Sequence, residues 1–365
     1  MKTLKYTIVL IILAVTINGL RAQEVVIKKD DFASKDDYKI AKEYLSKAEE
    51  YYALGRGGMK SALDFYLKVY QYIPNHAMLN YKIGSCYLHS IQKVKCLDYF
   101  KKAYSLNPAI QPDIVWLLAT GYHLNADFDK AIEFYTKYRN QLSPSDLQQK
   151  RKEIEKRIQE CNNGKEIIKN PVRVFIDNLG PNVNTMAPEY SPLISADESM
   201  LLFTSRRADT YGGGADPDDN MFFEDIYVSY NDGNGWSVAK NVGKPLNTKN
   251  NDATVGLSPD GTQLFTFNGK VNNGDIYVSK LKGAEWTAPD DGPLKKYINT
   301  EFHETSASFS FDGKTMYFVS DREGGFGGHD IWISQWDKEK ERWGQPRNIG
   351  SVINTEYDEE GVFMH

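Results

Sequence analysis

Residues 258–279 read SPDGTQLFTFNGKVNNGDIYVS, and this stretch decides the fold of the second half of the chain. It opens with a Ser-Pro-Asp-Gly turn, whose Asp260-Gly261 pair suits a tight hairpin because glycine readily takes a positive φ. The apolar run Leu264–Phe267 follows, and Asp275–Ser279 has the β-branched and aromatic content of a strand. The stretch therefore predicts two strands bounded by turns.

The same pattern recurs along the rest of the chain. Each copy opens with Asn-Thr, at 184–185, 247–248, 299–300 and 354–355. The third strand is almost identical in three copies, at Asp225–Ser229, Asp275–Ser279 and Asp330–Ser334. The Asn-Thr pairs are 63, 52 and 55 residues apart, the first spacing being longer because of an insertion around 211–223. Four short strands in a repeat of this length are typical of β-propeller blades.

The order Ser-Pro-Asp-Gly, Leu-Phe-Thr and Asp-Ile-Tyr-Val-Ser closely resembles the TolB-like, WD-like propeller repeats of bacterial envelope proteins. The resemblance covers about residues 172–365. Aligned on the third copy, Glu360–His365 matches Thr305–Ser310, so we expect the chain to end inside the first strand of a fourth blade. Three blades do not close a ring, which favours a truncated or split reading frame. The rival interpretation is that an oligomer or a partner supplies the missing blades.

The first half carries a different repeat. Its clearest unit, Leu79–Pro108, resembles the tetratricopeptide pattern of Leu-Gly, Tyr, Ala, Phe, Ala and Pro, with Cys96 in place of the first Ala. The equivalent positions Ala62, Cys96 and Ala131 are 34 and 35 residues apart, which is the tetratricopeptide period. Small residues let the two helices of a hairpin approach closely, and large ones fill the space between hairpins.

Together the repeats predict a multidomain α-then-β chain, a tetratricopeptide α-solenoid followed by a partial, about three-blade, TolB-like β-propeller. A charged helix expected over 146–160 fits a solvated cap on the helical array. The expected divisions are a signal peptide at 1–22, an N-terminal extension at 23–37, helical repeats with the capping helix at 38–165, and propeller repeats at 172–365.

The N-terminus predicts export. Lys2 and Lys5 precede an almost wholly apolar run at 6–17, and Ala22 offers a small residue before a cleavage site. The run is too short to span a bilayer comfortably, although an uncleaved membrane anchor is the alternative. With cleavage after Ala22 the mature chain begins at Gln23, and we expect it in the periplasm or on the periplasmic face of the outer membrane.

The order of signal peptide, tetratricopeptide array and propeller resembles a set of OmpA-family proteins found in Bacteroidetes. In that family a C-terminal OmpA-like domain binds peptidoglycan, and some members serve the type IX secretion apparatus. These residues include no OmpA-like domain, so the resemblance implies no direct peptidoglycan binding here. It does imply partners among envelope proteins, including outer-membrane or secretion-complex components.

Charge and motifs narrow the classes of function. Without residues 1–22 the chain has 41 basic and 49 acidic residues, with a net +5 over 23–170 and −13 over 171–365. The acidic second half disfavours nucleic acid as a partner. The sequence contains no His-Glu-x-x-His, phosphate loop or Gly-x-Ser-x-Gly elbow. We therefore expect neither enzymatic activity nor a cofactor, and we place His329 in a blade turn.

Candidate protein-binding residues occur in both halves. On the concave face of the helical array we expect Tyr81, Trp116 and His123, whose alternative role is core packing. On loops after the second strand of blades one and three we expect a charged set, whose alternative role is ion pairing within turns. This set consists of Arg206, Arg207, Asp321 and Arg322.

The cysteines and the acidic insertion have simpler interpretations. The odd count of Cys86, Cys96 and Cys161 predicts buried thiols on helices, with a Cys86–Cys96 disulfide as the alternative. The insertion starts like a calcium loop, but the glycine that such a loop requires is absent. A solvated loop is its default interpretation, and its candidate metal ligands are Asp216, Asp218 and Asn220.

The function expected from the sequence is a non-enzymatic protein-binding scaffold of the periplasm or outer membrane, with an accessory role in envelope assembly or type IX secretion. The alternative is the propeller part of a glycosidase or hydrolase whose catalytic portion lies beyond His365. The stretch Ser229–Trp236 resembles the Asp-box of sialidases, but Asn231 stands where that motif has its Asp.

Overall fold

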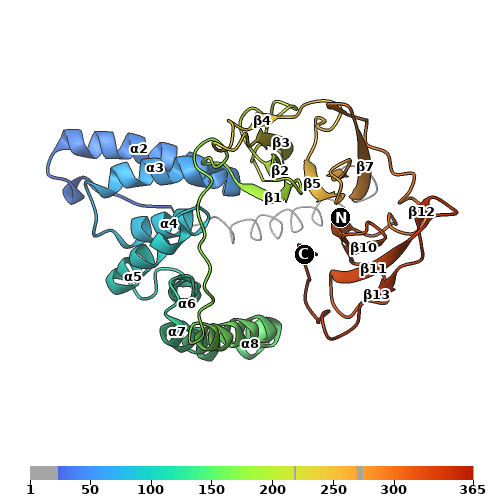
Figure 1. The fold of residues 1–365 in the computed structure, drawn as a ribbon. Helices are drawn as coiled ribbons and strands as arrows, with labels where there is room; N and C mark the ends of the chain where they lie inside the picture. Colours follow the sequence, from blue (N-terminus) through green and yellow to red (C-terminus); the bar gives the residue numbers. More distant parts are fainter. Residues whose placement is uncertain (1–23, 218, 269–273, 365) are drawn as a thin grey trace, which may run out of the picture. The chain divides into compact units, whose positions relative to one another are not determined.

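The computed structural model describes residues 24–217, 219–268 and 274–364. These residues form two compact units, which divide between Arg173 and Val174 (Figure 1). The signal peptide expected at 1–22 lies outside the described residues. No helix within the described ranges is both long enough and apolar enough to cross a bilayer. The first unit is an α-solenoid of helical hairpins, and the second consists of propeller-type β-sheets.

The helical unit contains three hairpins and a long last helix in the described part of the chain. Figure 1 shows α2 beside α3, α4 beside α5, and α6 beside α7. The α-helices are α2 (Lys35–Ala53), α3 (Met59–Tyr70), α4 (Ala77–Leu88), α5 (Cys96–Leu106), α6 (Ile114–Leu124), α7 (Phe128–Gln141) and α8 (Pro144–Ile167). Short 3-10 turns occur at η1 (Lys29–Asp31), η2 (Gly55–Gly58) and η3 (Lys93–Lys95).

Side-chain caps set where several helices begin. Ser34 Oγ accepts a hydrogen bond from the Asp37 amide at 3.0 Å at the start of α2. Ser143 does the same for the Asp146 amide at 3.2 Å, and Pro144 occupies the first turn of α8. Such caps satisfy amides that have no partner inside the helix. Because Ser143 caps it, α8 begins before residue 146, the start expected from its charge. The helix also continues past residue 160, to Ile167.

Small residues face large ones inside the hairpins, as the tetratricopeptide pattern predicts. Ala62, Cys96 and Ala131 are fully buried, each with an exposed fraction of 0%. On α4, a Cβ added to Gly84 would lie 2.6 Å from Cε1 of Phe100 on α5. Only glycine permits this approach, so the helix pair is as close as the pattern requires.

The three cysteines are buried and free. Burial raises the pKa of Cys86 to about 12 and the pKa values of Cys96 and Cys161 to about 11. These thiols are therefore protonated at neutral pH, and a buried protonated thiol is unreactive.

The described part of the second unit contains three antiparallel sheets, two of four strands and one of five, in which the first four strands of each are neighbours in the order of the chain. Blade one contains β1 (Glu189–Ile194), β2 (Met200–Ser205), β3 (Asp225–Tyr230) and β4 (Lys240–Asn241). Blade two contains β5 (Asp252–Leu257), β6 (Gln263–Asn268), β7 (Asp275–Lys282) and β8 (Glu285–Trp286). Blade three contains β9 (Glu304–Phe309), β10 (Thr315–Ser320), β11 (Asp330–Asp337) and β12 (Arg342–Trp343), and β13 (Arg347–Asn348) also pairs with β11.

The turn between the first two strands is built by its own side chains. In blade two, Asp260 Oδ1 accepts hydrogen bonds from Ser258 Oγ at 2.5 Å and from the Thr262 amide at 3.0 Å. Gly261 has φ +70°, a conformation that side chains disfavour. The Ser-Pro-Asp-Gly motif therefore fixes the hairpin before any long-range contact forms.

In the second, third and fourth Asn-Thr pairs, the asparagine side chain hydrogen-bonds the third strand of the blade before it. Asn247 Nδ2 donates to Ile226 O at 2.9 Å, and Asn247 Oδ1 accepts from the Ile226 amide at 2.9 Å. The same two bonds join Asn299 to Ile276 and Asn354 to Ile331. In the first copy, Asn184 makes no such side-chain bond with any described residue, because no described strand corresponding to β3 precedes it.

The last described residues run beside blade three as coil. The Glu359 amide donates to His329 O at 2.7 Å, and the Met364 amide donates to Ser308 Oγ at 2.9 Å. Residues 360–364, expected to start a strand, have no strand pairing here. A strand needs a partner strand, and among the described residues none pairs with 360–364.

Candidate functional site

An extended segment of the chain itself, residues 24–28, lies against α2 and the start of α4. The surface that it covers, which includes Glu49 and His76, is called the helical groove below. Val25 is buried, with an exposed fraction of 5%, and its amide donates to Glu49 Oε1 on α2 at 3.2 Å. At the start of α4, His76 Nδ1 accepts from the Leu79 amide, so Nε2 carries the hydrogen and donates to Val26 O at 2.9 Å. The segment is therefore held through its main chain.

A buried ion pair lies at the same place. Lys82 Nζ on α4 contacts Glu49 Oε2 at 3.2 Å, and the two side chains are 2% and 20% exposed. The ammonium also lies 3.8 Å from the centre of the Tyr52 ring. Buried charges are costly unless paired, so the Glu49 carboxylate serves both the Lys82 ammonium and the Val25 amide. Burial raises the pKa of Tyr52 to about 12, which keeps it a neutral donor.

Tyr81, expected on the concave face, lies next to this cluster on α4. Its hydroxyl donates to the Asp113 carboxylate, 3.1 Å from each oxygen, and its ring packs against Phe100. Burial raises the pKa of Tyr81 above its ordinary value. Tyr81 is therefore half-buried and bridges the second and third hairpins.

Trp116 and His123 both lie on α6 and pack against other side chains of the unit. The Trp116 ring is 4.9 Å from Tyr135 and 5.4 Å from Tyr138, measured between ring centroids. His123 Nδ1 lies 3.5 Å from the Tyr135 hydroxyl, and burial lowers its pKa. The structure brings these two residues together, at a different hairpin from the groove that contains residues 24–28.

Arg207 and Arg322 occupy equivalent places in blades one and three. Arg322 Nη2 contacts Glu304 at 3.0 Å and Ile298 O at 2.6 Å, and its side chain is 9% exposed. Arg207 likewise contacts Glu189 at 3.2 Å and Val183 O at 2.6 Å. Each guanidinium also lies over an aromatic ring of its blade. Their hydrogen bonds are thus directed into the blade.

Arg206 closes the acidic insertion. Its two terminal nitrogens contact the Asp219 carboxylate at 2.6 and 2.9 Å. Asp216 accepts from Asn251 Nδ2 at 2.7 Å, and Asn220 has φ +58° at the tip of the loop. Asp218 lies outside the described residues. Among the described His, Cys, Asp and Glu side chains of this insertion, no three could hold one metal ion. The predicted set with Asp218 and Asn220 stays a prediction.

Asp321, the remaining charged candidate, belongs to a different kind of cluster. It follows β10 and pairs with His303 at 3.0 Å rather than with an arginine.

At the opposite end of the strands, a pocket of about 630 Å³ lies between blades two and three. Its lining includes Phe265, Phe309, Trp336 and Trp343.

Sequence reasoning missed the residues that hold the segment in the helical groove. Glu49, His76 and Lys82 belong to no motif, and their helices are recognisable without them. The one signal available was Lys82 itself, a charge within the otherwise largely apolar run of α4. A charge on a buried helix face needs a partner, but the sequence does not say which carboxylate supplies it.

No protein-family model matches the chain, and no curated protein matches it. Among solved structures, the TPR2B-domain:pHsp70-complex of yeast Sti1 aligns with 34% of this chain and 98% of that chain, at 15% identity and a TM-score of 0.28. MamA aligns with 36% of this chain and 82% of that chain, at 22% identity and a TM-score of 0.27.

TolB from Acinetobacter baumannii aligns with 40% of this chain at 15% identity and a TM-score of 0.27. The alignment spans only 29% of that TolB chain. The assignment of the two units here rests on the repeats and hydrogen bonds of this chain.

Proposed function

We propose that this protein is a non-enzymatic scaffold that binds extended polypeptide segments of other envelope proteins in the helical groove. The observation that carries the proposal is the segment 24–28, which lies in that groove as a bound peptide would. The Val25 amide and the Val26 carbonyl supply the two direct hydrogen bonds. Because both contacts are to main-chain atoms, another extended segment can replace this one.

The cellular setting of the proposal comes from the sequence. Lys2, Lys5 and the apolar run at 6–17 support export, and the acidic propeller unit supports a partner other than nucleic acid. The resemblance to OmpA-family proteins supports a role as an accessory of envelope assembly or type IX secretion. In this role the helical groove and the propeller are two binding surfaces on one chain.

The test uses a chain in which residues 24–30 are replaced by a Gly-Ser stretch, and a fluorescent peptide corresponding to residues 23–31. We expect saturable binding by fluorescence anisotropy. N-methylation of the peptide at Val25 removes the hydrogen bond to Glu49, and should weaken binding about 5- to 10-fold, the equivalent of about 1–1.5 kcal/mol. N-methylation at Val26, a residue that is 71% exposed, is the matched control because its amide makes no hydrogen bond with the described residues.

Equal loss of affinity for the two methylated peptides would contradict main-chain recognition in this register. In cells that express the chain with the Gly-Ser replacement, a photoreactive residue at the exposed position Asn75, beside His76, should cross-link to envelope proteins. The products should diminish when the unlabelled peptide is added to permeabilised envelopes. Cross-links confined to cytoplasmic proteins would contradict the proposed location.

A further inference from the structure

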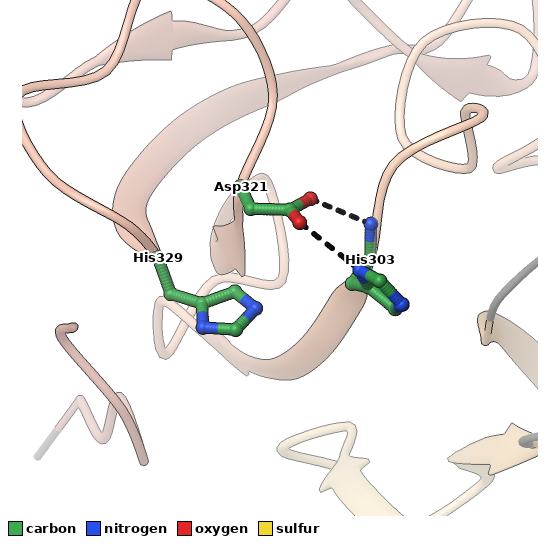
Figure 2. Close-up of side chains that lie close together, drawn as sticks. All are labelled: His303, Asp321 and His329. Carbon is green, nitrogen blue, oxygen red and sulfur yellow. Dashed lines mark hydrogen bonds and ion pairs between the residues drawn. The ribbon is translucent and has the colours of Figure 1, made fainter. Parts of the chain in front are cut away.

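Three side chains from different parts of the sequence meet at one end of blade three. His303 immediately precedes β9, Asp321 immediately follows β10, and His329 immediately precedes β11. Because adjacent strands of the blade are antiparallel, these three positions lie at the same end of the neighbouring strands. Each side chain offers one ligand atom, and these atoms all lie within 4.8 Å of one another (Figure 2).

Two of the three side chains are already held in place. His303 Nδ1 lies 3.0 Å from Asp321 Oδ2, and the His303 amide donates to Asp321 Oδ1 at 2.7 Å. These two contacts fix the orientation of the Asp321 carboxylate toward the His303 ring.

His329 approaches the pair with a nitrogen that has no partner. Its Nδ1 lies 3.4 Å from Asp358 Oδ1 and 3.2 Å from Glu360 Oε1. Its Nε2 is buried and makes no hydrogen bond with the described residues. Figure 2 shows that a ring nitrogen of His329 faces the Asp321 carboxylate and the His303 ring. A buried nitrogen left without a partner is costly, and a metal ion would supply one.

We propose that His303, Asp321 and His329 bind a divalent transition-metal ion of the Zn²⁺ type. The ligand atoms are Nδ1 of His303, Oδ2 of Asp321 and Nε2 of His329, and the fourth tetrahedral position is left for water or a group from a partner. Two imidazoles and one carboxylate select zinc and similar ions over Ca²⁺ or Mg²⁺, which prefer oxygen ligands.

The distances suit such an ion after small side-chain rotations. With zinc–ligand distances of about 2.0–2.2 Å, ligand atoms in a tetrahedral site lie about 3.3–3.6 Å apart. The nitrogen of His303 and the oxygen of Asp321 are 3.0 Å apart, so these two atoms would separate slightly and His329 would move toward them. The carboxylates behind Nδ1 of His329 match the carboxylate–histidine–metal arrangement, in which the carboxylate fixes the tautomer and strengthens the ligand.

A bound ion would also tie the end of the described chain to blade three. Asp358 and Glu360 lie behind His329, and the Glu359 amide donates to the His329 carbonyl at 2.7 Å. The ion would hold the His329 ring in the orientation that these contacts require. Metal binding should therefore raise the melting temperature of the propeller unit.

The test uses the chain without residues 1–22, stripped with a chelator and titrated with Zn²⁺ in competition with a chromophoric chelator. We expect one equivalent to bind, and visible absorption bands of tetrahedral Co²⁺ when Co²⁺ replaces zinc. His303→Gln and His329→Gln should each weaken binding by more than about 100-fold, because even the loss of a residue behind a ligand costs about 10- to 100-fold. The double variant Asp358→Asn with Glu360→Gln should weaken zinc binding by about 10- to 100-fold.

The matched control is His89→Gln, which removes an exposed imidazole in the helical unit and should leave zinc affinity unchanged. Near-ultraviolet circular dichroism confirms that each variant is folded. The proposal is overturned if the wild-type chain binds no zinc, or if it binds zinc without the tetrahedral Co²⁺ spectrum. It is also overturned if affinity survives in both His303→Gln and His329→Gln, or falls equally in His89→Gln.

Discussion

At the scale of single residues, the propeller unit depends on asparagine side chains that form hydrogen bonds with main-chain amides and carbonyls of a strand. An asparagine that follows each blade bonds both the amide and the carbonyl of an isoleucine in the third strand. This pair of hydrogen bonds is present for Asn247, Asn299 and Asn354. In the first copy, Asn184 forms neither bond with a described residue. The four asparagines look alike in the sequence, yet they contribute differently to stability.

This difference gives a direct prediction. Asn247→Ala leaves the Ile226 amide without its partner and removes one of two hydrogen bonds to the Ile226 carbonyl, which also accepts from the Val242 amide at 3.1 Å. It should lower the free energy of unfolding of the propeller unit by about 1–3 kcal/mol. Asn184→Ala removes no such bond and should change it by less than about 0.5 kcal/mol. Urea unfolding followed by the fluorescence of the five tryptophans of the propeller unit measures both variants. Equal destabilisation would show that Asn184 also has a partner strand.

At the scale of elements, the hairpins of the helical unit depend on close approach at glycine. Gly84 lies in the middle of α4, where alanine would favour an isolated helix by about 1 kcal/mol. In the folded unit the added Cβ would meet the Phe100 ring at 2.6 Å. Helix propensity alone predicts that alanine at position 84 is stabilising, whereas packing against Phe100 makes it destabilising.

We expect Gly84→Ala to destabilise the helical unit by about 1–3 kcal/mol, as overpacking of a core generally does. The double variant Gly84→Ala with Phe100→Leu should recover part of this loss relative to the sum of the single changes, because the smaller side chain gives the Cβ room. Thermal unfolding monitored by circular dichroism at the helical band checks both. A stabilised single variant would mean that α4 and α5 are further apart than the structure shows.

At the scale of the whole molecule, the proposed function requires that the chain leave the cytoplasm. An apolar run of about 12 residues is shorter than the ~20 that a transmembrane helix needs, and Ala22 supplies the small residue of a cleavage site. We expect the envelope form to begin at Gln23 and to lack the mass of residues 1–22. Ala22→Trp should block the cut. Intact-mass spectrometry checks both, and an envelope form that retains Met1 would favour the membrane-anchor alternative.

Part of this structure could be predicted from residues 258–279 and their repeats. The Ser-Pro-Asp-Gly turn is local, because its side-chain hydrogen bonds join residues two to five positions apart. The strands that follow it are recognisable from their own composition. The positions Ala62, Cys96 and Ala131 are likewise set by a period, and they are buried as that period requires. Patterns of this kind predict a fold class because they reflect contacts close in sequence.

The candidate sites could not be predicted in the same way. Val25 and Glu49 are 24 residues apart, and Val26 and His76 are 50 apart, so no spacing indicates that they meet. His329 was expected in a blade turn, which is where it lies. What the sequence did not show is that the same turn faces His303 and Asp321, because that depends on how the strands of blade three pair.

The sequence by itself determined the two repeat types, their order and the positions of the small and turn-forming residues, because periodicity and turn chemistry act over a few neighbouring residues. The tertiary structure was needed to show which asparagine has a partner and which segment lies in the helical groove. It was also needed to show which side chains meet at one end of the strands of blade three. These depend on strand and helix pairing between residues far apart in the chain, and their energies arise only after the elements have packed.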